Sequence, residues 1–468
     1  MANNLKILLI IIHLLWFVLI ASALDPPELV IIILSQEQGY SAAQAKLLKS
    51  NVIEQANSLE RDPPQIFLSH ELDVYGAWTI VPIFAYLGTG NISATWYFFC
   101  LENTAIRLGN LLKVLDKYDV NIYKNLWIGH ALYDHEPTII HHYAEHRKKF
   151  KYPNVASGFA VSKFLFKSLA ERANEVITAN FDFSIDASYE FSTFVLNQSK
   201  GSRLTHVSEF CVVSNKNCAT YPKPFYSCGE TPVKQNAFVA VKTCSKYHLE
   251  RLDVIRQTWA KHAENIGFFT DELDENLVDG HVVPKTDEGH CAKTYAILKN
   301  VHPILERDQL DWLIITDDDT IMSLGRLFKM LTCYNPKDAV ALGERYGYRI
   351  TKIHGYDYLT GGSGVVLSKK LVEQMIKPGV CECPSATTPD DMFLFGVCLA
   401  HLGVKVTHSA AFHQARPNDY PKALLASQDP VSFHKFWMVD PKNVYKQWFY
   451  EEDLQTFPPK KFRRHTEL

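Results

Sequence analysis

The stretch that decides the fold reads Trp312-Leu313-Ile314-Ile315-Thr316-Asp317-Asp318-Asp319-Thr320. Its apolar part has the length and composition of a strand buried in a sheet. Three adjacent carboxylates at the end of a buried strand are costly unless a cation or hydrogen bonds satisfy them. The alternative is a solvated acidic turn before a helix that begins near Ser323. The strand in front of the aspartates favours a divalent metal site, because carboxylate oxygens bind hard cations.

Strand and helix patterns alternate around this stretch. Short apolar runs predict strands at residues 237–241, 267–271 and 365–368, and apolar residues at helical spacing predict helices at 249–262 and 294–305. This alternation predicts an α/β fold with a mostly parallel sheet covered on both faces. Ligands bind at the carboxyl ends of the strands in such sheets, which is where the three aspartates lie.

Three further features could carry chemistry. The glycine cluster at residues 361–364 would let the backbone approach a ligand closely, although a plain turn has the same composition. Asp390 and Asp391 open a predicted helix, where carboxylates usually act as N-terminal caps; alternatively, one of them is a general base. His413 follows a strand-like segment, and a single histidine is more often structural than a ligand.

Together, and in this order, the motifs resemble the fringe-type β-1,3-glycosyltransferases. The motifs that carry the resemblance are the strand leading to Thr243, residues 251–259, 317–319, 361–364 and 389–391, and Phe412-His413. Within the family, the chain is most similar to the β-1,3-glucosyltransferase branch that extends O-linked fucose on thrombospondin type 1 repeats. That finer resemblance is carried by residues 342–348, 406–409, 412–417 and 432–435 and by the final Glu-Leu.

The resemblance implies a GT-A (Rossmann-like) glycosyltransferase fold, an inverting transfer, a UDP-sugar donor and Mn²⁺. By this resemblance the metal ligands are Asp319, His413 and Asp317. The donor-binding residues are Lys242, Thr243, Arg251, Asp317, Asp318 and Gly362. Asp391 is the catalytic base, with Asp390 as the alternative. An inverting transfer needs one carboxylate to remove the acceptor proton while a metal neutralises charge on the leaving diphosphate.

The activity implied is transfer of glucose from UDP-glucose in β-1,3 linkage onto O-linked fucose of folded thrombospondin type 1 repeats. Two alternatives stay open. The donor sugar could be N-acetylglucosamine or galactose, because pocket shape decides that choice. The chain could also be a catalytically silent lumenal lectin or quality-control module, although its intact acidic motifs argue against this.

The first half of the chain is interpreted as a degenerate copy of the second. Segments that align in the same order are 96–104 with 312–320, 126–129 with 340–343, 157–162 with 363–368, and 205–211 with 407–413. In this alignment the three aspartates become Leu101, Glu102 and Asn103, and the expected metal histidine becomes Cys211. We therefore predict a GT-A-like first domain that binds neither metal nor donor. Chance similarity is the alternative, and unrelated strand orders would exclude a repeat.

The predicted organisation has five parts: a signal peptide at residues 1–23, the degenerate domain at 25–210, a Cys- and Pro-rich linker at 211–234, the catalytic domain at 235–455, and a tail at 456–468. The apolar run at residues 7–20, followed by Ala21-Ser22-Ala23, is typical of a cleaved secretory signal, with a signal anchor as the alternative. The terminal His465-Thr466-Glu467-Leu468 is similar to a retrieval signal. Together they predict the lumen of the endoplasmic reticulum and a retrieval receptor as a partner.

The composition is consistent with a lumenal location. The sequence has 10 cysteines, which in an oxidising compartment predicts disulfides of unreadable connectivity. Cys381-Glu382-Cys383 is too tight for a zinc knuckle, so these cysteines are expected to be structural. Sequons at Asn91 and Asn197 are compatible with the secretory route. The net charge of −3 over 468 residues gives no reason to expect a nucleic-acid partner.

Overall fold

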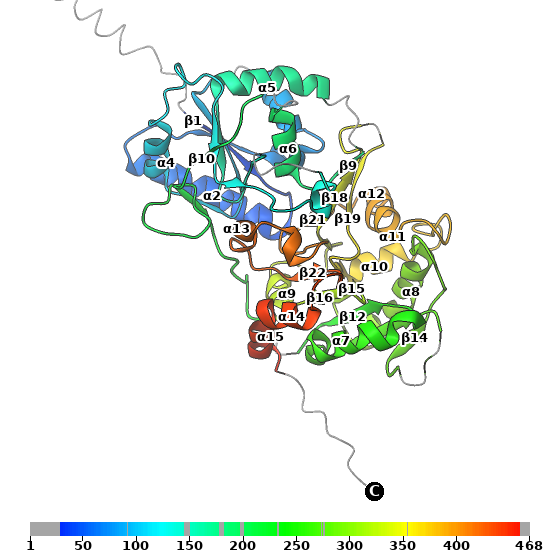
Figure 1. Ribbon diagram of the computed structural model, residues 1–468. Helices are drawn as coiled ribbons and strands as arrows, with labels where there is room; N and C mark the ends of the chain where they lie inside the picture. Colours follow the sequence, from blue (N-terminus) through cyan, green and yellow to red (C-terminus); the bar gives the residue numbers. More distant parts are fainter. Residues whose placement is uncertain are drawn as a thin grey trace, which may run out of the picture.

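The computed structural model describes residues 29–458 except 91, 145–149, 177–181, 197–200, 232–233, 273, 275–276 and 353. The predicted signal peptide, both sequon asparagines and the terminal tetrapeptide lie outside the described residues. Within the described ranges, no helix has the length and apolar character needed to cross a bilayer. The two halves of the chain form two lobes, the first half above the second in Figure 1.

The second half is built on a seven-stranded sheet of order β14-β13-β12-β15-β20-β17-β21. Its strands are β12 (Ala237–Lys242), β13 (Ile266–Thr270), β14 (Gly280–Val282), β15 (Trp312–Asp317), β17 (Ala341–Gly343), β20 (Val365–Ser368) and β21 (Thr407–His408). The stretch quoted above is therefore the central strand, β15. The predicted α/β fold is confirmed, with one difference in strand direction: β20 runs antiparallel to both of its neighbours.

Alternate side chains of β15 explain how the sheet is covered. Trp312 and Ile314 join a hydrophobic cluster on one face, and Leu313 and Ile315 join another on the opposite face. This is the two-residue period of a strand buried on both sides. The helices of this half are α7 (Asp253–Gln257), α8 (Cys291–Arg307), α9 (Leu324–Leu331), α10 (Lys369–Met375), α11 (Asp390–Met392), α12 (Cys398–His401), α13 (Lys422–Leu425), α14 (Pro441–Trp448) and α15 (Tyr450–Thr456).

The helix predicted at residues 249–262 is not continuous. A π-helical turn at His248–Leu252, α7, and a 3₁₀ turn at Trp259–His262 follow one another. The break falls at Thr258, whose φ and ψ are −105° and −112°. The apolar positions that suggested the helix, Leu252, Ile255 and Trp259, are nevertheless all buried. Hydrophobic spacing thus identified the buried face, although it could not locate the irregular backbone.

The first half contains a six-stranded sheet of order β10-β5-β8-β3-β1-β2. Its strands are β1 (Leu29–Leu34), β2 (Gln65–Leu68), β3 (Trp96–Leu101), β5 (Trp127–Gly129), β8 (Phe159–Ser162) and β10 (Thr205–His206). Its helices are α2 (Gly39–Ser58), α3 (Val81–Gly88), α4 (Leu108–Leu115), α5 (Lys163–Val176) and α6 (Ala187–Leu196). Two hydrophobic clusters again cover the two faces of the sheet.

The two sheets share one topology. Written from the same edge, β2-β1-β3-β8-β5-β10 matches β13-β12-β15-β20-β17-β21, and each pair of neighbours has the same relative direction. Registers agree as well: Trp96 pairs with Ser162 as Trp312 pairs with Ser368. The chain is therefore two tandem copies of one GT-A-like α/β fold, as the sequence alignment of the halves predicted.

Part of the predicted linker belongs to the first copy. The short strand β11 (Thr220–Pro222) pairs antiparallel with β4 (Thr104–Ile106), just as β22 (Ser432–His434) pairs with β16 (Thr320–Met322) in the second copy. A three-residue strand in a Cys- and Pro-rich segment has no periodic pattern, so the sequence predicts a linker there and no strand. The cysteines of this segment form disulfides, as expected: Cys211 bonds Cys218 and Cys228 bonds Cys333.

The remaining disulfides lie in the second half. Cys381 bonds Cys398, and Cys383 bonds Cys291. Both cysteines of the Cys-Glu-Cys motif are therefore structural, in agreement with the sequence argument. Cys100 and Cys244 are the free cysteines among the residues that the structure describes.

The two halves are joined by polar contacts and by a shared sheet. Strand β9 (Phe183–Ser184) of the first half adds to β18 (Arg345–Tyr348) and β19 (Tyr356–Leu359) of the second. The side-chain amide of Gln36 donates to the His408 carbonyl oxygen at 2.9 Å and accepts from the His408 amide at 2.7 Å.

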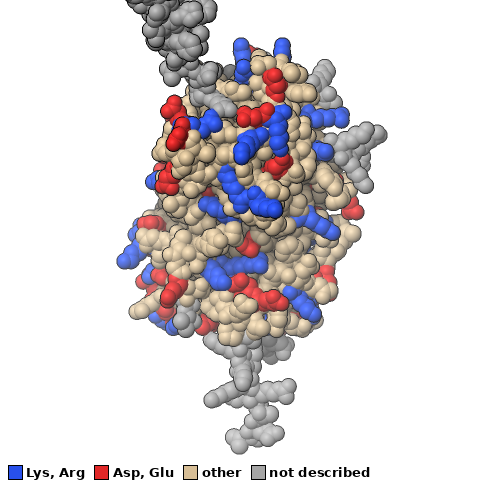
Figure 2. All heavy atoms as spheres, turned by 90° about the vertical axis from the view of Figure 1, so that its left-hand side faces the viewer, with Lys and Arg blue, Asp and Glu red and all other residues tan. Residues whose placement is uncertain are grey.

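Figure 2 shows basic and acidic side chains interspersed on the face in view, which agrees with the near-neutral net charge.

Candidate active site

A carboxylate and histidine cluster forms at the carboxyl end of β15. Asp317 is the last residue of that strand, and Asp319 stands just before β16. The pairing of β16 with β22 sets Thr320 opposite His434, so the backbone register brings this imidazole to the aspartates. His434 Nε2 lies 3.0 Å from Asp319 Oδ1 and 3.6 Å from Asp317 Oδ2. One ligand atom from each of the three residues lies within 4.8 Å of the other two, an arrangement that fits a divalent ion.

The histidine of this cluster is not the one expected. His413 was assigned to the metal with Asp319 and Asp317, but its ring stacks on Phe433, is 3% exposed, and does not join the cluster. Burial lowers the pKa of His413 to about 3, so the ring is neutral. The geometry thus brings His434, and not His413, next to the two aspartates. The segment Ser432-Phe433-His434-Lys435, already part of the family resemblance, was the signal that could have identified it.

Lys242 and Asp390 form a buried ion pair beside the cluster. Lys242, the last residue of β12, lies 2.7 Å from Asp390 Oδ2 and 3.1 Å from Asp317 Oδ1. Thr294 of α8 also donates a 2.5 Å hydrogen bond to Asp390 Oδ2. Burial opposes the charged forms of both Lys242 and Asp390. The carboxylates of Asp317 and Asp390 nevertheless raise the pKa of Lys242, and Lys242 lowers the pKa of Asp390. Asp390 is thus a charged, fully engaged partner, and a poor proton acceptor.

Arg251 and Thr243 hold Asp318. Arg251 NH1 lies 2.6 Å from Asp318 Oδ1 and 3.1 Å from Asp319 Oδ2, and Thr243 donates to Asp318 Oδ2 at 2.7 Å. Burial raises the pKa of Asp318 to about 6 against the effect of Arg251. Burial also acts to raise the pKa of Asp319, but its contacts with His434 and Arg251 outweigh burial and leave that pKa below its usual value. The three predicted donor-site residues Lys242, Thr243 and Arg251 therefore all contact the aspartates.

Gly362 makes room for the histidine. A Cβ atom at this position would lie 2.3 Å from Cε1 of His434, whereas one at Gly361 would have Lys242 Nζ, at 3.8 Å, as its nearest neighbour. The carbonyl oxygen of Gly362 also accepts a 2.8 Å hydrogen bond from Thr320. The glycine cluster was predicted for close approach to a ligand. In the structure, Gly362 permits the close approach of the imidazole.

Asp391 stands at the edge of the same site. It is half-buried at the start of α11, and its Oδ1 accepts the Met392 amide at 2.8 Å. Burial first, and then the neighbouring Asp390 charge, raise the pKa of Asp391 to about 6. No lysine or arginine forms an ion pair with it among the described residues. The two adjacent aspartates therefore differ sharply: Asp390 is neutralised by Lys242, and Asp391 is free to exchange a proton.

The corresponding end of the first sheet has lost this chemistry. Strand registers place Leu34 where Lys242 stands, and Leu101 where Asp317 stands. The pairing of β4 with β11 sets Pro222 opposite Thr104, so Pro222 is the counterpart of His434. The alignment had named Cys211 as the counterpart of the metal histidine. That pairing changes because the histidine itself changes from His413 to His434.

Comparison with known proteins agrees with this description. The Fringe-like family model matches residues 233–465. The chain is 42% identical over 444 residues to a mouse (Mus musculus) β-1,3-glucosyltransferase, covering 92% of this chain and 89% of that protein. It is 41% identical to the human (Homo sapiens) β-1,3-glucosyltransferase, with 92% and 86% covered.

More distant relatives match less than half of this chain. The bovine (Bos taurus) β-1,3-N-acetylglucosaminyltransferase lunatic fringe is 28% identical over 240 residues, covering 46% of this chain and 62% of that protein. Because the mouse and human relatives match at more than 40% identity along most of their own length, the chain belongs to the Fringe-like family of β-1,3-glycosyltransferases.

Proposed function

We propose that this enzyme transfers glucose from UDP-glucose, with inversion, in β-1,3 linkage onto O-linked fucose of folded thrombospondin type 1 repeats. The observation that carries the proposal is the site at the end of β15, where a metal-ligand set, a Lys242–Asp390 pair and an unpaired Asp391 come together. The names of the 41–42% identical relatives support glucose as the transferred sugar.

The residues of the cluster fit a divalent ion. Two carboxylates and an imidazole would hold Mn²⁺, and Arg251 already partly balances the aspartate charge, 3.1 Å from Asp319. When bound, such an ion stabilises negative charge that develops on a diphosphate leaving group. Asp317, Asp319 and His434 are proposed as its protein ligands, with His434 in place of the originally expected His413.

The remaining residues position the donor and move the proton. Lys242, Thr243 and Arg251, with Asp318 fixed between the last two, are proposed to border the uridine diphosphate site. Asp391 is proposed as the general base that takes the proton of the acceptor hydroxyl. Its pKa of about 6 leaves it ionised at neutral pH, yet basic enough to accept a proton. Asp390 holds Lys242 in place.

A second donor deserves a direct test. The similarity to lunatic fringe, whose name specifies N-acetylglucosamine transfer, favours UDP-N-acetylglucosamine over other alternative donors. The acetamido group is larger than the hydroxyl it replaces, so the walls of the donor site would have to differ. A catalytically silent lectin is disfavoured, because a binding module has no need for the unpaired Asp391 beside a metal-ligand set.

We also propose the predicted organisation and location. Residues 25–210 with the strand β11 would form the non-catalytic copy, and residues 235–455 the catalytic one. The signal peptide at 1–23 and the terminal His-Thr-Glu-Leu would direct and return the enzyme to the lumen of the endoplasmic reticulum. Four disulfides among the described cysteines support an oxidising compartment.

The test is a transfer assay with purified full-length enzyme and a folded, O-fucosylated thrombospondin repeat. UDP-glucose, UDP-N-acetylglucosamine and UDP-galactose are supplied separately, each with Mn²⁺ and with a chelator, and the products are identified by mass spectrometry. We expect a hexose to be added from UDP-glucose only, and only with metal. Transfer of N-acetylglucosamine instead would replace the proposed donor, and the absence of any transfer would contradict the acceptor.

A further inference from the structure

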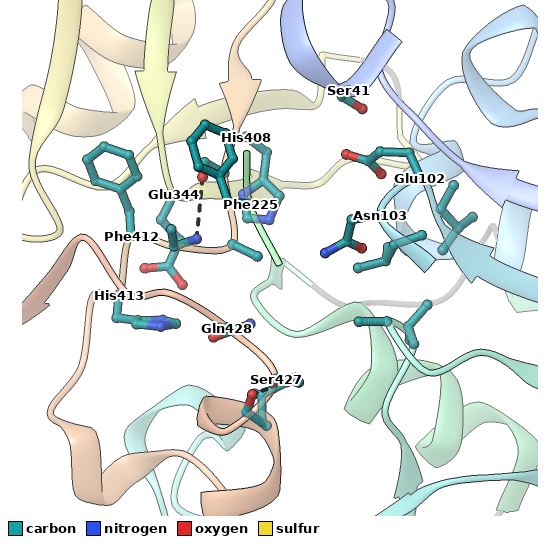
Figure 3. Close-up of a pocket in the computed structure, with 18 of the residues that line it drawn as sticks. Ser41, Glu102, Asn103, Phe225, Glu344, His408, Phe412, His413, Ser427 and Gln428 are labelled. Carbon is teal, nitrogen blue, oxygen red and sulfur yellow. Dashed lines mark hydrogen bonds between the residues drawn. The ribbon is translucent and has the colours of Figure 1, made fainter. Parts of the chain in front are cut away.

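A cavity of about 480 Å³ lies between the two copies, at the carboxyl end of the first sheet. Figure 3 shows Ser41, Glu102 and Asn103 of the first copy on one side of it, and His413, Gln428 and Ser427 of the second copy on the other. The cavity therefore lies where the first copy would hold a donor, and the second copy closes it.

The walls have lost what a nucleotide diphosphate needs. The positions that provide Lys242, the three aspartates and His434 in the second copy provide Leu34, Leu101, Glu102, Asn103 and Pro222 in the first. Of the two metal-ligand aspartates, one is replaced by a leucine and the other by an amide, and the histidine is replaced by a proline. The ligand set that the second copy offers to a metal-bridged diphosphate is therefore missing at the aligned positions of the first copy, so the cavity requires a different chemistry.

Unpartnered polar atoms line this space. His413 is 3% exposed, its ring borders the cavity in Figure 3, and its Nε2 has no hydrogen-bond partner. Gln428 lies beside His413 and interacts with its ring, whereas the side-chain oxygen of Asn103, across the cavity, has no hydrogen-bond partner. Buried polar atoms normally find partners, so an unpartnered atom on each side of one cavity indicates an absent polar occupant.

Charged side chains also line the cavity, but they have partners within the protein: Lys329 pairs with Glu452, Asp186 pairs with His141, and Arg345 stacks over Trp78. The other polar groups named above are amides and an imidazole that burial keeps neutral. Burial also raises the pKa of Glu102, and raises that of Glu344 to about 8, so the Glu344 carboxyl is largely protonated at neutral pH and can donate a hydrogen bond. Aromatic side chains complete the wall: Tyr40, Trp78, Tyr152, Phe225, Tyr334 and Phe412. Neutral donors and acceptors beside aromatic faces suit a molecule with several hydroxyls and an apolar ring face.

We propose that this cavity is a second carbohydrate site, which binds a neutral mono- or disaccharide at the former donor end of the first copy. Its size accommodates one or two pyranose rings, and binding there involves no transfer. The proposal is independent of the donor and acceptor assigned to the catalytic site. It gives the first copy a function that the loss of its metal ligands leaves open.

The test is ligand-observed saturation-transfer NMR on the full-length protein, with methyl α-L-fucopyranoside and methyl β-D-glucopyranoside as probes. Asn103→Leu removes an amide whose Oδ1 has no hydrogen-bond partner, at nearly constant volume, and Ser427→Trp fills the cavity from its half-buried rim. Asp391→Asn is the matched control at the catalytic site. Thermal unfolding of each variant verifies that it is folded.

We expect saturation of at least one probe in the wild type and in Asp391→Asn, and a loss of affinity of about tenfold or more in both cavity variants, since a tenfold loss corresponds to about one buried hydrogen bond. No saturation with either sugar would mean that water alone fills the cavity and would overturn the proposal. Saturation that persists in both cavity variants would place the sugar elsewhere and would also overturn it. Binding of UDP that both cavity variants abolish would identify an anion site instead.

Discussion

At the scale of single residues, two buried histidines that lie 21 positions apart in the sequence, His413 and His434, have different surroundings. His434 lies beside Asp319 and Asp317, while the ring of His413 stacks on Phe433 and does not join the metal-ligand cluster. Because only His434 can share a cation with the aspartates, we expect His434→Ala to weaken Mn²⁺-dependent UDP binding by about tenfold to a hundredfold or more. Calorimetric titration of UDP at fixed Mn²⁺ measures this loss.

His413→Ala is the matched control for that titration. It removes a buried ring and so lowers the unfolding temperature, but it should leave metal-dependent UDP binding within about twofold of the wild type, because no ligand is lost. Equal losses of UDP affinity in the two variants would contradict a specific role of His434 in metal binding. A loss in His413→Ala alone would restore the original assignment.

The two adjacent aspartates should also behave differently. Asp391→Asn keeps the shape of the site but removes the proposed base, so we expect transfer to fall by about a hundredfold to ten-thousandfold while UDP binding is kept. Asp390→Asn instead breaks the ion pair with Lys242 and should weaken UDP binding as well as turnover. Steady-state kinetics and UDP titration on both variants separate the roles. Near wild-type turnover in Asp391→Asn would exclude it as the base.

The raised pKa of Asp391 predicts an acid limb in the rate profile. The base must be ionised to accept a proton, so activity is full above its pKa and is lost as pH falls through about 6. An ordinary aspartate would keep its activity to about pH 4. The measurement is kcat against pH from 4.5 to 8 at saturating donor, with Mn²⁺ held constant. A flat profile down to pH 4.5 would contradict the assigned base.

At the scale of elements, the β16–β22 pair and the glycine turn together fix the metal cluster. Gly362→Ala would place a methyl group 2.3 Å from Cε1 of His434, so the imidazole must move away from the aspartates. We expect the apparent affinity for Mn²⁺ to fall by about tenfold or more, as when a supporting contact of a ligand is lost. Gly361→Ala, with Lys242 Nζ at 3.8 Å as its nearest neighbour, is the adjacent control and should leave Mn²⁺ affinity unchanged.

The same elements show what the sequence could and could not predict. The strands β12, β13, β15 and β20 were predictable because each is a short apolar run buried on both faces. β22 was not, because a three-residue strand carries no period, and its partner β16 lies more than a hundred positions earlier. The aspartates were found through the strand before them, whereas the histidine depended on a pairing between distant segments. The sequence therefore predicted which carboxylates lie together, but not which imidazole lies beside them.

At the scale of the whole molecule, the repeat was predictable from order alone. Each aligned segment kept its place along the chain, and the two sheets have the same strand order. The contacts between the copies were not predictable, because they are made by residues in loops and short turns such as Gln36 and Trp78. Such positions have no hydrophobic period, so the cavity between the copies could not be inferred before the structure.

Packing between the copies makes the first copy a determinant of stability for the second. Trp78 Nε1 donates a 2.9 Å hydrogen bond to Asp357 Oδ1, and the Arg345 guanidinium lies 4.4 Å from the Trp78 ring. Trp78→Phe leaves the Asp357 carboxyl without this donor, and burial already raises the pKa of Asp357. We expect the free energy of unfolding to fall by about 1–3 kcal/mol, the cost of a buried acceptor left unpaired.

Tyr75→Phe is the control variant, because it removes a hydrogen bond between the copies that is exposed to solvent. The Tyr75 hydroxyl also crosses the interface, donating to the Gly355 carbonyl oxygen at 2.9 Å, but its side chain is 60% exposed. Water can replace the lost donor there, so this variant should change the free energy of unfolding by less than about 0.5 kcal/mol. Denaturant titrations of both variants against the wild type measure the difference. Equal, small effects would mean that the copies are joined chiefly by the β9–β18 pairing and the Gln36–His408 contacts, and that the Trp78 contact adds little to holding them together.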